Sequence, residues 1–268
     1  MLCNVSVANV HLREAIPAAA AAGFEVMSIA ARPYAKSGMS PGALRLLLDD
    51  HGVRVQEIEA SFDWLALPER GSAPWLHAEH TTDELIALGE ELGAETVVGV
   101  HAGASFPPEI AAEAFGRFCD RAAAHGMKAA LEYVAFATIS DLDSAWEVVA
   151  RAGRPNGGLL VDLWHHRRSL STDELLRTIP PDRVYSVQLS DGMRAPEGSL
   201  QDDVQHRRLP GEGEFDAVGF VRTLVGNGVT CPFGVEAFEP DRLRRGLPEA
   251  LATLHDTLDA VVRAGSGA

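Results

Sequence analysis

Four polar residues between positions 132 and 236 lie near the ends of apolar runs, and the side chain of each has an oxygen atom that could bind a metal ion. They are Glu132 in "ALEYV", Asp162 in "LLVDLWH", Gln188 in "YSVQLSD" and Glu236 in "FGVEAF". A carboxylate among aliphatic residues is costly unless a cation or a hydrogen-bond donor compensates its charge. If the runs are neighbouring parallel strands, the four side chains converge, and three carboxylates that converge repel one another strongly.

A hard divalent cation would balance this charge, because such cations prefer oxygen ligands. The set contains no histidine or cysteine, so it predicts one Mn²⁺ or Mg²⁺ ion rather than Zn²⁺, with Co²⁺ as a possible substitute. Taken singly, each residue could instead pair with a lysine or arginine, or lie exposed at a strand end. The recurrence at equivalent places in four consecutive runs favours a shared metal site formed by Glu132, Asp162, Gln188 and Glu236.

The residues that follow Asp162 divide into two groups. His165 comes three residues later, where it could contact a substrate or act as an acid or base; a surface position is the alternative. His166 fits that surface role better, and we expect it to begin a solvent-exposed turn with Arg167 and Arg168.

Other polar residues are weaker candidates for the same site. His101 ends the run 95–102 and is either a substrate-binding residue or a packed strand-end histidine, and Glu59 ranks below it. Arg207 and Arg208 precede "LPGEGEFD", and either could fold over the site to hold a substrate oxygen; a surface patch is the alternative, above all for Arg207. Four aromatic residues could wall a pocket or simply pack: Phe62, Trp64, Trp75 and Phe106.

Eight short apolar runs alternate with longer amphipathic segments along the chain. Most are continuously hydrophobic, as expected for parallel strands that are covered on both faces. Strand followed by helix, repeated eight times, predicts an α/β fold, a (β/α)8 TIM barrel that spans residues 1–268 as a single domain. In such barrels active sites lie at the carboxyl ends of the strands. The predicted strands are 2–8, 25–31, 53–60, 95–102, 128–135, 158–165, 184–191 and 233–239.

The segments between the runs carry helix signals. Thr81 with Glu84, and Ser171 with Glu174, have the spacing of capping boxes. The stretch 40–52 begins with Ser-Pro and ends in Gly, which are start and stop signals. The segment 191–214 is long for a connection inside a compact domain, so we expect it to be functional.

Composition excludes several classes of partner. The 268 residues include 38 acidic and 23 basic side chains, a net charge of −15, which disfavours binding to nucleic acid or an anionic membrane. The three cysteines have no metal-ligand or disulfide spacing, so we expect reduced thiols. We find no membrane-spanning run and no signal-peptide pattern, so a cytoplasmic protein is expected.

Together, five motifs resemble the xylose isomerase-like barrel superfamily, in its sugar phosphate isomerase/epimerase branch. The resemblance is strongest over 128–240. It implies that Glu132 and Glu236 are metal ligands and proton-transfer groups, that Asp162 is a ligand, and that His165 and Arg208 contact the substrate. Barrels of this type often form homo-oligomers. The motifs are "LEY", "LLVDLWHHRRS", "VQLSDG", "RRLPGEGEFD" and "GVEAF".

The third ligand position departs from the epimerase pattern. Many epimerases have histidine there, whereas Gln188 resembles the 3-dehydroshikimate dehydratases, whose "PG-G-FD" segment is also similar; inosose dehydratases are a further resemblance. The prediction is therefore a metal-dependent isomerase or epimerase of a keto sugar or cyclitol that works through an enediolate. The alternative is a dehydratase with His165 as the acid.

Three further conclusions limit this prediction. The chain has no glycine-rich phosphate loop, so we expect an unphosphorylated small-molecule substrate. A non-catalytic barrel subunit is a minor alternative. The loss of one of the predicted metal ligands would favour it, and none of them is lost. An apurinic endonuclease-like hydrolase would need a histidine-rich zinc site and a basic face, and the net charge of −15 and Gln188 count against it.

Overall fold

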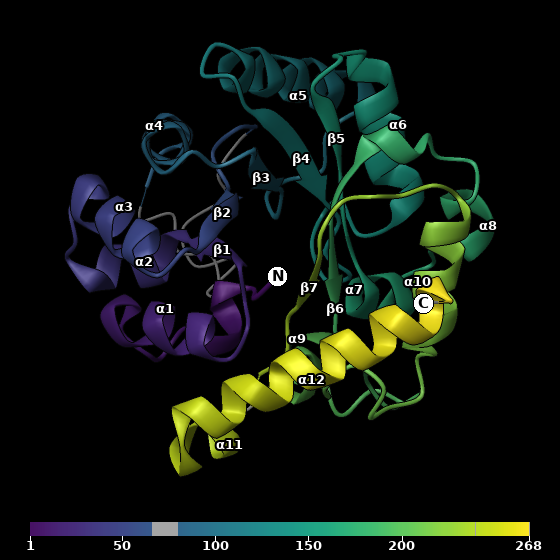
Figure 1. The fold of residues 1–268 in the computed structure, drawn as a ribbon. Helices are drawn as coiled ribbons and strands as arrows, with labels where there is room; N and C mark the ends of the chain where they lie inside the picture. The colour runs from purple at the N-terminus through teal and green to yellow at the C-terminus, as the bar shows by residue number, and fades with distance from the viewer. Residues whose placement is uncertain (66–79, 239, 268) are drawn as a thin grey trace.

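A computed structural model describes residues 1–65, 80–238 and 240–267. Seven parallel strands form one sheet in sequence order, which curves into a nearly closed barrel with helices around it (Figure 1). This confirms the predicted TIM-barrel class. The strands are β1 Val26–Ala30, β2 Arg54–Ser61, β3 Thr96–Val100, β4 Lys128–Glu132, β5 Gly157–Asp162, β6 Val184–Leu189 and β7 Phe233–Val235.

The prediction of an eighth strand over residues 2–8 is wrong. Leu2 alone pairs, with Met27 of β1 on one side and Val235 of β7 on the other, so a single residue bridges the gap in the barrel. The 3-10 helix η1 (Asn4–Val7) begins two residues later. The polar side chain of Asn4 explains the change, because its Oδ1 accepts from the backbone N–H of Ala30 at 3.3 Å in place of a strand partner.

Alternation along the strands directs the polar residues inward. Residues two apart lie on the same face, so Glu132 shares a face with Ala130, and Asp162 shares a face with Leu160. Ala130 and Leu160 belong to a small buried cluster that is separate from the main core. The main core lies between the outer face of the sheet and the helices.

The helices confirm some of the predicted caps and correct one. Thr81 and Glu84 form the predicted capping box at the start of α4, and Ser40 caps α3. The Ser171 capping box is wrong, because Thr172 caps α8 and Ser171 Oγ accepts from the N–H of Leu142 instead. The helices are α1 Leu12–Ala21, α2 Ala31–Ser37, α3 Pro41–Asp50, α4 Thr82–Leu92, α5 Pro108–Ala123, α6 Leu142–Ala152, α7 Leu163–Arg168, α8 Asp173–Leu176, α9 Leu200–Asp203, α10 Ala217–Gly226, α11 Pro240–Arg245 and α12 Leu247–Ser266.

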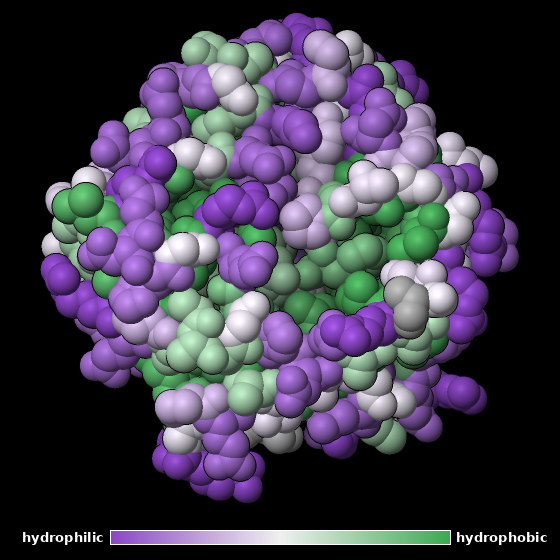
Figure 2. Space-filling view, viewed as in Figure 1, coloured by the Kyte–Doolittle hydropathy of each residue, from purple (hydrophilic) through white to green (hydrophobic). Residues whose placement is uncertain are grey.

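No helix of the described residues is long and apolar enough to cross a membrane. The face of the molecule seen in Figure 2 is mostly hydrophilic, with hydrophobic residues gathered in a hollow near its centre.

The long segment 191–214 is ordered by its own contacts. It contains α9 and the 3-10 helix η3 (Val204–His206), and an isolated antiparallel bridge joins Asp191 to Arg208. The buried carboxylate of Asp191 also accepts from the backbone N–H groups of Gly211 and Phe215. These bonds fold the segment back over the carboxyl ends of the strands.

Candidate active site

A cavity of about 770 Å³, which we name the mouth cavity, opens at the carboxyl ends of the strands. Ionisable side chains from β2, β4, α7, the residue after β7 and the segment 191–214 lie at its base, and apolar side chains line its walls. These ionisable residues are Glu59, Glu132, His165, Arg207 and Glu236, and Arg32 and His206 also line the cavity. The apolar wall includes Pro33, Phe62, Val134, Phe136, Phe238 and Leu243.

Arg207 lies among the carboxylates at the base of the mouth cavity. Its side chain is 1% exposed, and its Nη1 lies 2.7 Å from Asp162 Oδ2 and 3.1 Å from Glu236 Oε1. Burial alone would lower the pKa of Arg207, but the carboxylates of Asp162 and Glu236 raise it, so the guanidinium stays charged. The rings of Trp164 and Phe238 lie 5.3 and 5.6 Å from the guanidinium.

Asp162 and His165 are placed by one local motif. Asp162 ends β5 and caps α7, because its Oδ1 accepts from the backbone N–H of His165 at 2.8 Å. This cap turns the imidazole of His165 into the cavity, where its Nε2 lies 3.9 Å from Glu132 Oε1. Burial lowers the pKa of His165 to about 3, so the ring is neutral at physiological pH.

A second acidic cluster surrounds Gln188. The Gln188 amide donates from Nε2 to Glu59 Oε2 at 2.9 Å and to Glu57 Oε1 at 3.5 Å. Ser28 Oγ donates to the other oxygen of Glu59. Gln188 Oε1 and Glu57 Oε2 are buried and have no hydrogen-bond partner among the described residues.

The buried glutamates hold their protons unusually tightly. Burial, followed by the nearby charge of Glu236, raises the pKa of Glu132 well above its ordinary value. Burial raises the pKa of Glu236 to about 8, that of Glu59 to about 8 and that of Glu57 to about 7. The pKa values stay raised although Arg207 lies beside these acids, which is the electrostatic setting that a bound cation relieves.

The chemistry of the donors fits a divalent cation. The unpartnered Gln188 Oε1 is an available oxygen ligand, and Glu132, Asp162 and Glu236 supply carboxylates. Within residues 1–65, 80–238 and 240–267, however, no three His, Cys, Asp or Glu side chains are grouped as a ready-made metal site. Arg207 Nη1 lies between Asp162 and Glu236, two of the four predicted ligands.

The two predicted substrate-binding residues, His101 and Arg208, are not among the residues that line the mouth cavity. The buried His101 ring contacts Trp64 and Phe106, and its Nε2 lies 2.9 Å from the carbonyl of Ala104. The side chain of Arg208 is exposed, because the bridge to Asp191 turns it away from the cavity. Arg207, the neighbour considered the better candidate for a surface patch, lies inside instead.

The expected exposed turn after His165 is also wrong. His166 is buried: its Nδ1 lies 2.9 Å from the Tyr133 hydroxyl, and its Nε2 lies 3.0 Å from Asp173 Oδ1. The Arg168 side chain is 6% exposed and pairs with Asp203 at 2.6 Å. Both residues belong to α7 and join it to distant parts of the chain.

Of the candidate wall aromatics, Phe62 lines the cavity. Trp64 packs against Phe115 and Phe118, and Phe106 packs against His101. Trp75 lies outside the described residues.

The partners of Arg168 escaped sequence reasoning. Besides Asp203, the Arg168 guanidinium donates to the carbonyl oxygens of Met193 and Arg194, so it fastens the segment 191–214 to α7. Two adjacent arginines after a histidine pair carry no local signal of such distant partners. Glu57 was also missed, although its spacing of two from Glu59 in a strand places both on one face.

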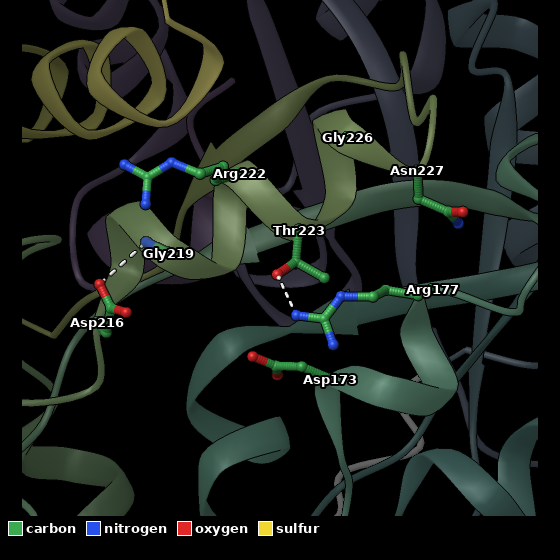
Figure 3. A pocket seen from close by; sticks show the side chains of 8 residues that line it. All are labelled: Asp173, Arg177, Asp216, Gly219, Arg222, Thr223, Gly226 and Asn227. Carbon is green, nitrogen blue, oxygen red and sulfur yellow. Dashed lines mark hydrogen bonds between the residues drawn. The ribbon is translucent and has the colours of Figure 1, made fainter.

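A second hollow lies on the outside of the barrel between α8 and α10, and we name it the outer groove. Figure 3 shows Asp173 and Arg177 on one side of it and the α10 residues on the other. Its charged and polar groups contact one another: Arg177 donates to Thr223 Oγ1 at 3.5 Å, and Asp216 accepts from the Gly219 N–H at 3.0 Å. Its lining residues are Asp173, Arg177, Asp216, Gly219, Arg222, Thr223, Gly226 and Asn227.

Comparison with known families agrees with this geometry. Residues 16–257 match the model of the family described as "Xylose isomerase-like TIM barrel". The chain belongs to this family. The match covers all seven strands, and with them every residue at the base of the mouth cavity.

Xylose isomerase-like relatives of the chain include enzymes of two reaction types. The 3-dehydroshikimate dehydratase of Pseudomonas aeruginosa is 28% identical over 242 residues, which cover 87% of this chain and 38% of that protein. The inosose isomerase of Bacillus velezensis is 29% identical over 153 residues, which cover 56% of this chain and 54% of that protein. The chain thus spans well under two thirds of either relative.

Solved structures of xylose isomerase-like barrels share the fold. The IOLI protein with a bound zinc atom superposes with a TM-score of 0.84 and 22% identity, covering 98% of this chain and 97% of that one. L-ribulose 3-epimerase superposes with a TM-score of 0.70 and 16% identity, covering 91% and 86%. At these identities the likeness concerns the fold alone.

Proposed function

We propose that this barrel is a divalent-metal-dependent isomerase or epimerase of a small, unphosphorylated keto sugar or cyclitol. The observation that carries the proposal is the pair of buried glutamates, Glu132 at the end of β4 and Glu236 just after β7, that line one cavity and have raised pKa values. Two such groups on opposite faces of a substrate could remove a proton beside the carbonyl and return one from the other side.

The metal would be held by Glu132, Asp162, Gln188 and Glu236, with Mn²⁺ or Mg²⁺ the preferred ion for this oxygen set. When bound, it would supply Lewis-acid stabilisation of the oxygen that gains negative charge. The unpartnered Gln188 Oε1 and the excess of buried carboxyl groups support this assignment. A relative of similar fold is described with a zinc atom, which also supports divalent-metal use.

The protein's own groups would then move the protons and orient the substrate. In the metal-free protein burial raises the pKa of Glu236 to about 8, and a bound cation would lower it, so that the carboxylate could accept a proton from the substrate carbon. The neutral His165 would hold a substrate hydroxyl beside Glu132, and Arg207 would donate to a substrate oxygen. The Phe136 and Phe238 side chains in the wall would limit access of water to the reacting carbon.

A dehydratase is the second candidate, and two observations favour it. His165 Nε2 lies 3.9 Å from Glu132 Oε1, so a base and an acid stand side by side. The dehydratase relative also aligns over 87% of the chain. In this reaction Glu132 would take the proton beside the carbonyl, and the neutral His165 would give its Nε2 proton to the departing β-hydroxyl and regain one from Glu132, so that a C–H and a C–O bond break, a C=C bond forms and water leaves.

One experiment separates the candidates. The Mn²⁺-loaded protein is incubated in D₂O with ketohexoses, inososes or 3-dehydroshikimate, and NMR follows deuterium at the carbon beside the carbonyl. Deuterated substrate or isomer supports the isomerase or epimerase, whereas an ultraviolet-absorbing unsaturated product supports the dehydratase. No exchange and no product with all three classes, in a preparation shown to bind Mn²⁺, would contradict the proposed function.

A further inference from the structure

Arg207 occupies the contacts that a metal ion at this site requires. Its Nη1 lies 2.7 Å from Asp162 Oδ2 and 3.1 Å from Glu236 Oε1. Both residues belong to the proposed ligand set. A guanidinium and a divalent cation that shared these oxygens would be neighbouring positive charges in a buried site, where repulsion is poorly screened. The two cations are therefore alternatives at Asp162 and Glu236.

The hydrogen bonds of His165 show that the present position of Arg207 is not ideal. The backbone N–H of Ala135 donates to His165 Nδ1 at 3.2 Å. A neutral imidazole has one acceptor nitrogen, so Nε2 then carries the proton. Arg207 Nη2, which can only donate, lies 3.1 Å from that same Nε2. Two donors thus face each other, a conflict that ends if the guanidinium moves away.

The surroundings of Arg207 allow such a movement. Arg207 lines the mouth cavity, so open space lies beside it. Its Nε is buried and has no hydrogen-bond partner in the described part of the chain, so this nitrogen does not fix the side chain. The Trp164 and Phe238 rings contact the guanidinium through their π systems, which tolerate sliding better than directional hydrogen bonds do. The bridge between Asp191 and Arg208 holds the backbone in place meanwhile.

We infer that Arg207 is an internal cation that competes with the divalent metal ion for Asp162 and Glu236 and turns into the mouth cavity when the metal binds. The displaced guanidinium then donates to a substrate oxygen. Metal binding and substrate binding are thereby coupled through one side chain, and metal binds before substrate. This inference rests on the metal dependence of the proposed function.

The test is a calorimetric titration of the metal-free protein with MnCl₂. Arg207→Met keeps the side-chain length and removes the competing charge. We expect it to bind Mn²⁺ at least about tenfold more tightly than the wild type, a change equivalent to about 1.4 kcal/mol. Arg208→Met is the matched control, since that side chain is exposed, and its Mn²⁺ affinity should equal that of the wild type. Equal or weaker binding by Arg207→Met would overturn the inference.

Thermal unfolding with and without Mn²⁺ gives a second readout. Without metal, Arg207→Met should melt below the wild type, because buried carboxylates lose their cation. Added Mn²⁺ should raise its melting temperature more than that of the wild type. If Arg207→Met does not fold without metal, Arg207→Lys keeps one charge and should bind Mn²⁺ with intermediate affinity; an affinity at or below the wild-type value would overturn the inference.

The outcomes also separate this inference from the proposed function. If neither the wild type nor Arg207→Met binds Mn²⁺, both fail. If both bind it equally well, the metal-dependent function stands and only the competition fails.

Discussion

The mouth cavity, of about 770 Å³, and the outer groove, of about 560 Å³, differ in how their charged groups are compensated. In the outer groove each acid has partners: Asp173 accepts from Arg167 Nη1 at 2.6 Å and from Nη2 at 3.2 Å, and Asp216 caps α10. In the mouth cavity several buried acids surround Arg207, and Gln188 Oε1 lacks a partner among the described residues.

The pKa shifts of the two regions have opposite directions. The hydrogen bonds from His166 and Arg167 hold the pKa of Asp173 below its ordinary value, whereas burial raises that of Glu236 to about 8. Size therefore does not distinguish a functional site here. Uncompensated charge and unsatisfied hydrogen-bond acceptors do distinguish the mouth cavity, because folding alone would not favour such groups.

The largest expected effect is on proton exchange. Glu132→Gln should lower the rate of deuterium incorporation into substrate by about 10³-fold, because it removes a proton-transfer group from the mouth cavity. Arg177→Gln, in the outer groove, should leave the rate unchanged. NMR of the substrate in D₂O measures both. A Glu132→Gln variant with near wild-type exchange would remove the basis for assigning chemistry to the mouth cavity.

The next effect is on stability without metal. Asp162→Asn should lower the free energy of unfolding by about 3 kcal/mol, because Arg207 stays buried and loses its closest carboxylate. Asp173→Asn should lower it by about 1 kcal/mol, since that pair is partly exposed to water. Urea unfolding at pH 7 with EDTA gives both values. Equal losses of unfolding free energy in the two variants would contradict the difference in charge compensation between the mouth cavity and the outer groove.

A third test compares the adjacent arginines of α7, Arg167 and Arg168, which pair with different carboxylates. Arg168→Gln should release the segment 191–214 and speed its amide hydrogen exchange at least about tenfold, or about 1.4 kcal/mol of local stability. Arg167→Gln should accelerate exchange in 191–214 less, because its partners are Asp173 in the outer groove and the carbonyl of Phe215, which follows the segment. Mass spectrometry of peptic fragments measures the amide exchange of both variants. Equal acceleration of exchange in 191–214 by both variants would contradict the assignment of Arg168 as the residue that holds this segment.

The smallest effect concerns pH. Because the folded-state pKa of Asp173 lies below its unfolded value of about 3.9, its stabilisation is complete above about pH 5 and is lost as the pH falls. The stability difference between wild type and Asp173→Asn should therefore be constant from pH 7 to about pH 5 and shrink at about pH 4 and below. Urea unfolding across this range checks it. A difference that grows in acid would contradict the sign.

The segment Asp162–Arg168 shows where sequence reasoning succeeded and where it stopped. The apolar run before Asp162 predicted a buried strand, and the position of Asp162 at its end placed the carboxylate near the site. The sequence after Asp162 also predicted an exposed turn. In the structure Asp162 caps a helix, and contacts with Tyr133, Asp173 and Asp203 bury the residues that follow. Tyr133 and Asp203 are more than 30 residues away from the residues they contact, and no local pattern predicts those contacts.

The choice between Arg207 and Arg208 has the same cause. Two adjacent arginines are chemically identical, but neighbouring side chains on an extended backbone point in opposite directions. The backbone bridge between Asp191 and Arg208 decides which one faces the carboxylates, and it forms only once β6 and the segment 191–214 are folded together.

By itself the sequence determined the barrel and the kinds of polar side chain that follow its apolar runs, because apolar runs, their spacing and the type of each polar residue are local properties. The tertiary structure decided which cation compensates Asp162 and Glu236, which arginine enters the cavity and which histidine is buried beside it. Those outcomes depend on long-range contacts, in which burial sets the strength of each charge and the surrounding chain fixes the direction of each side chain.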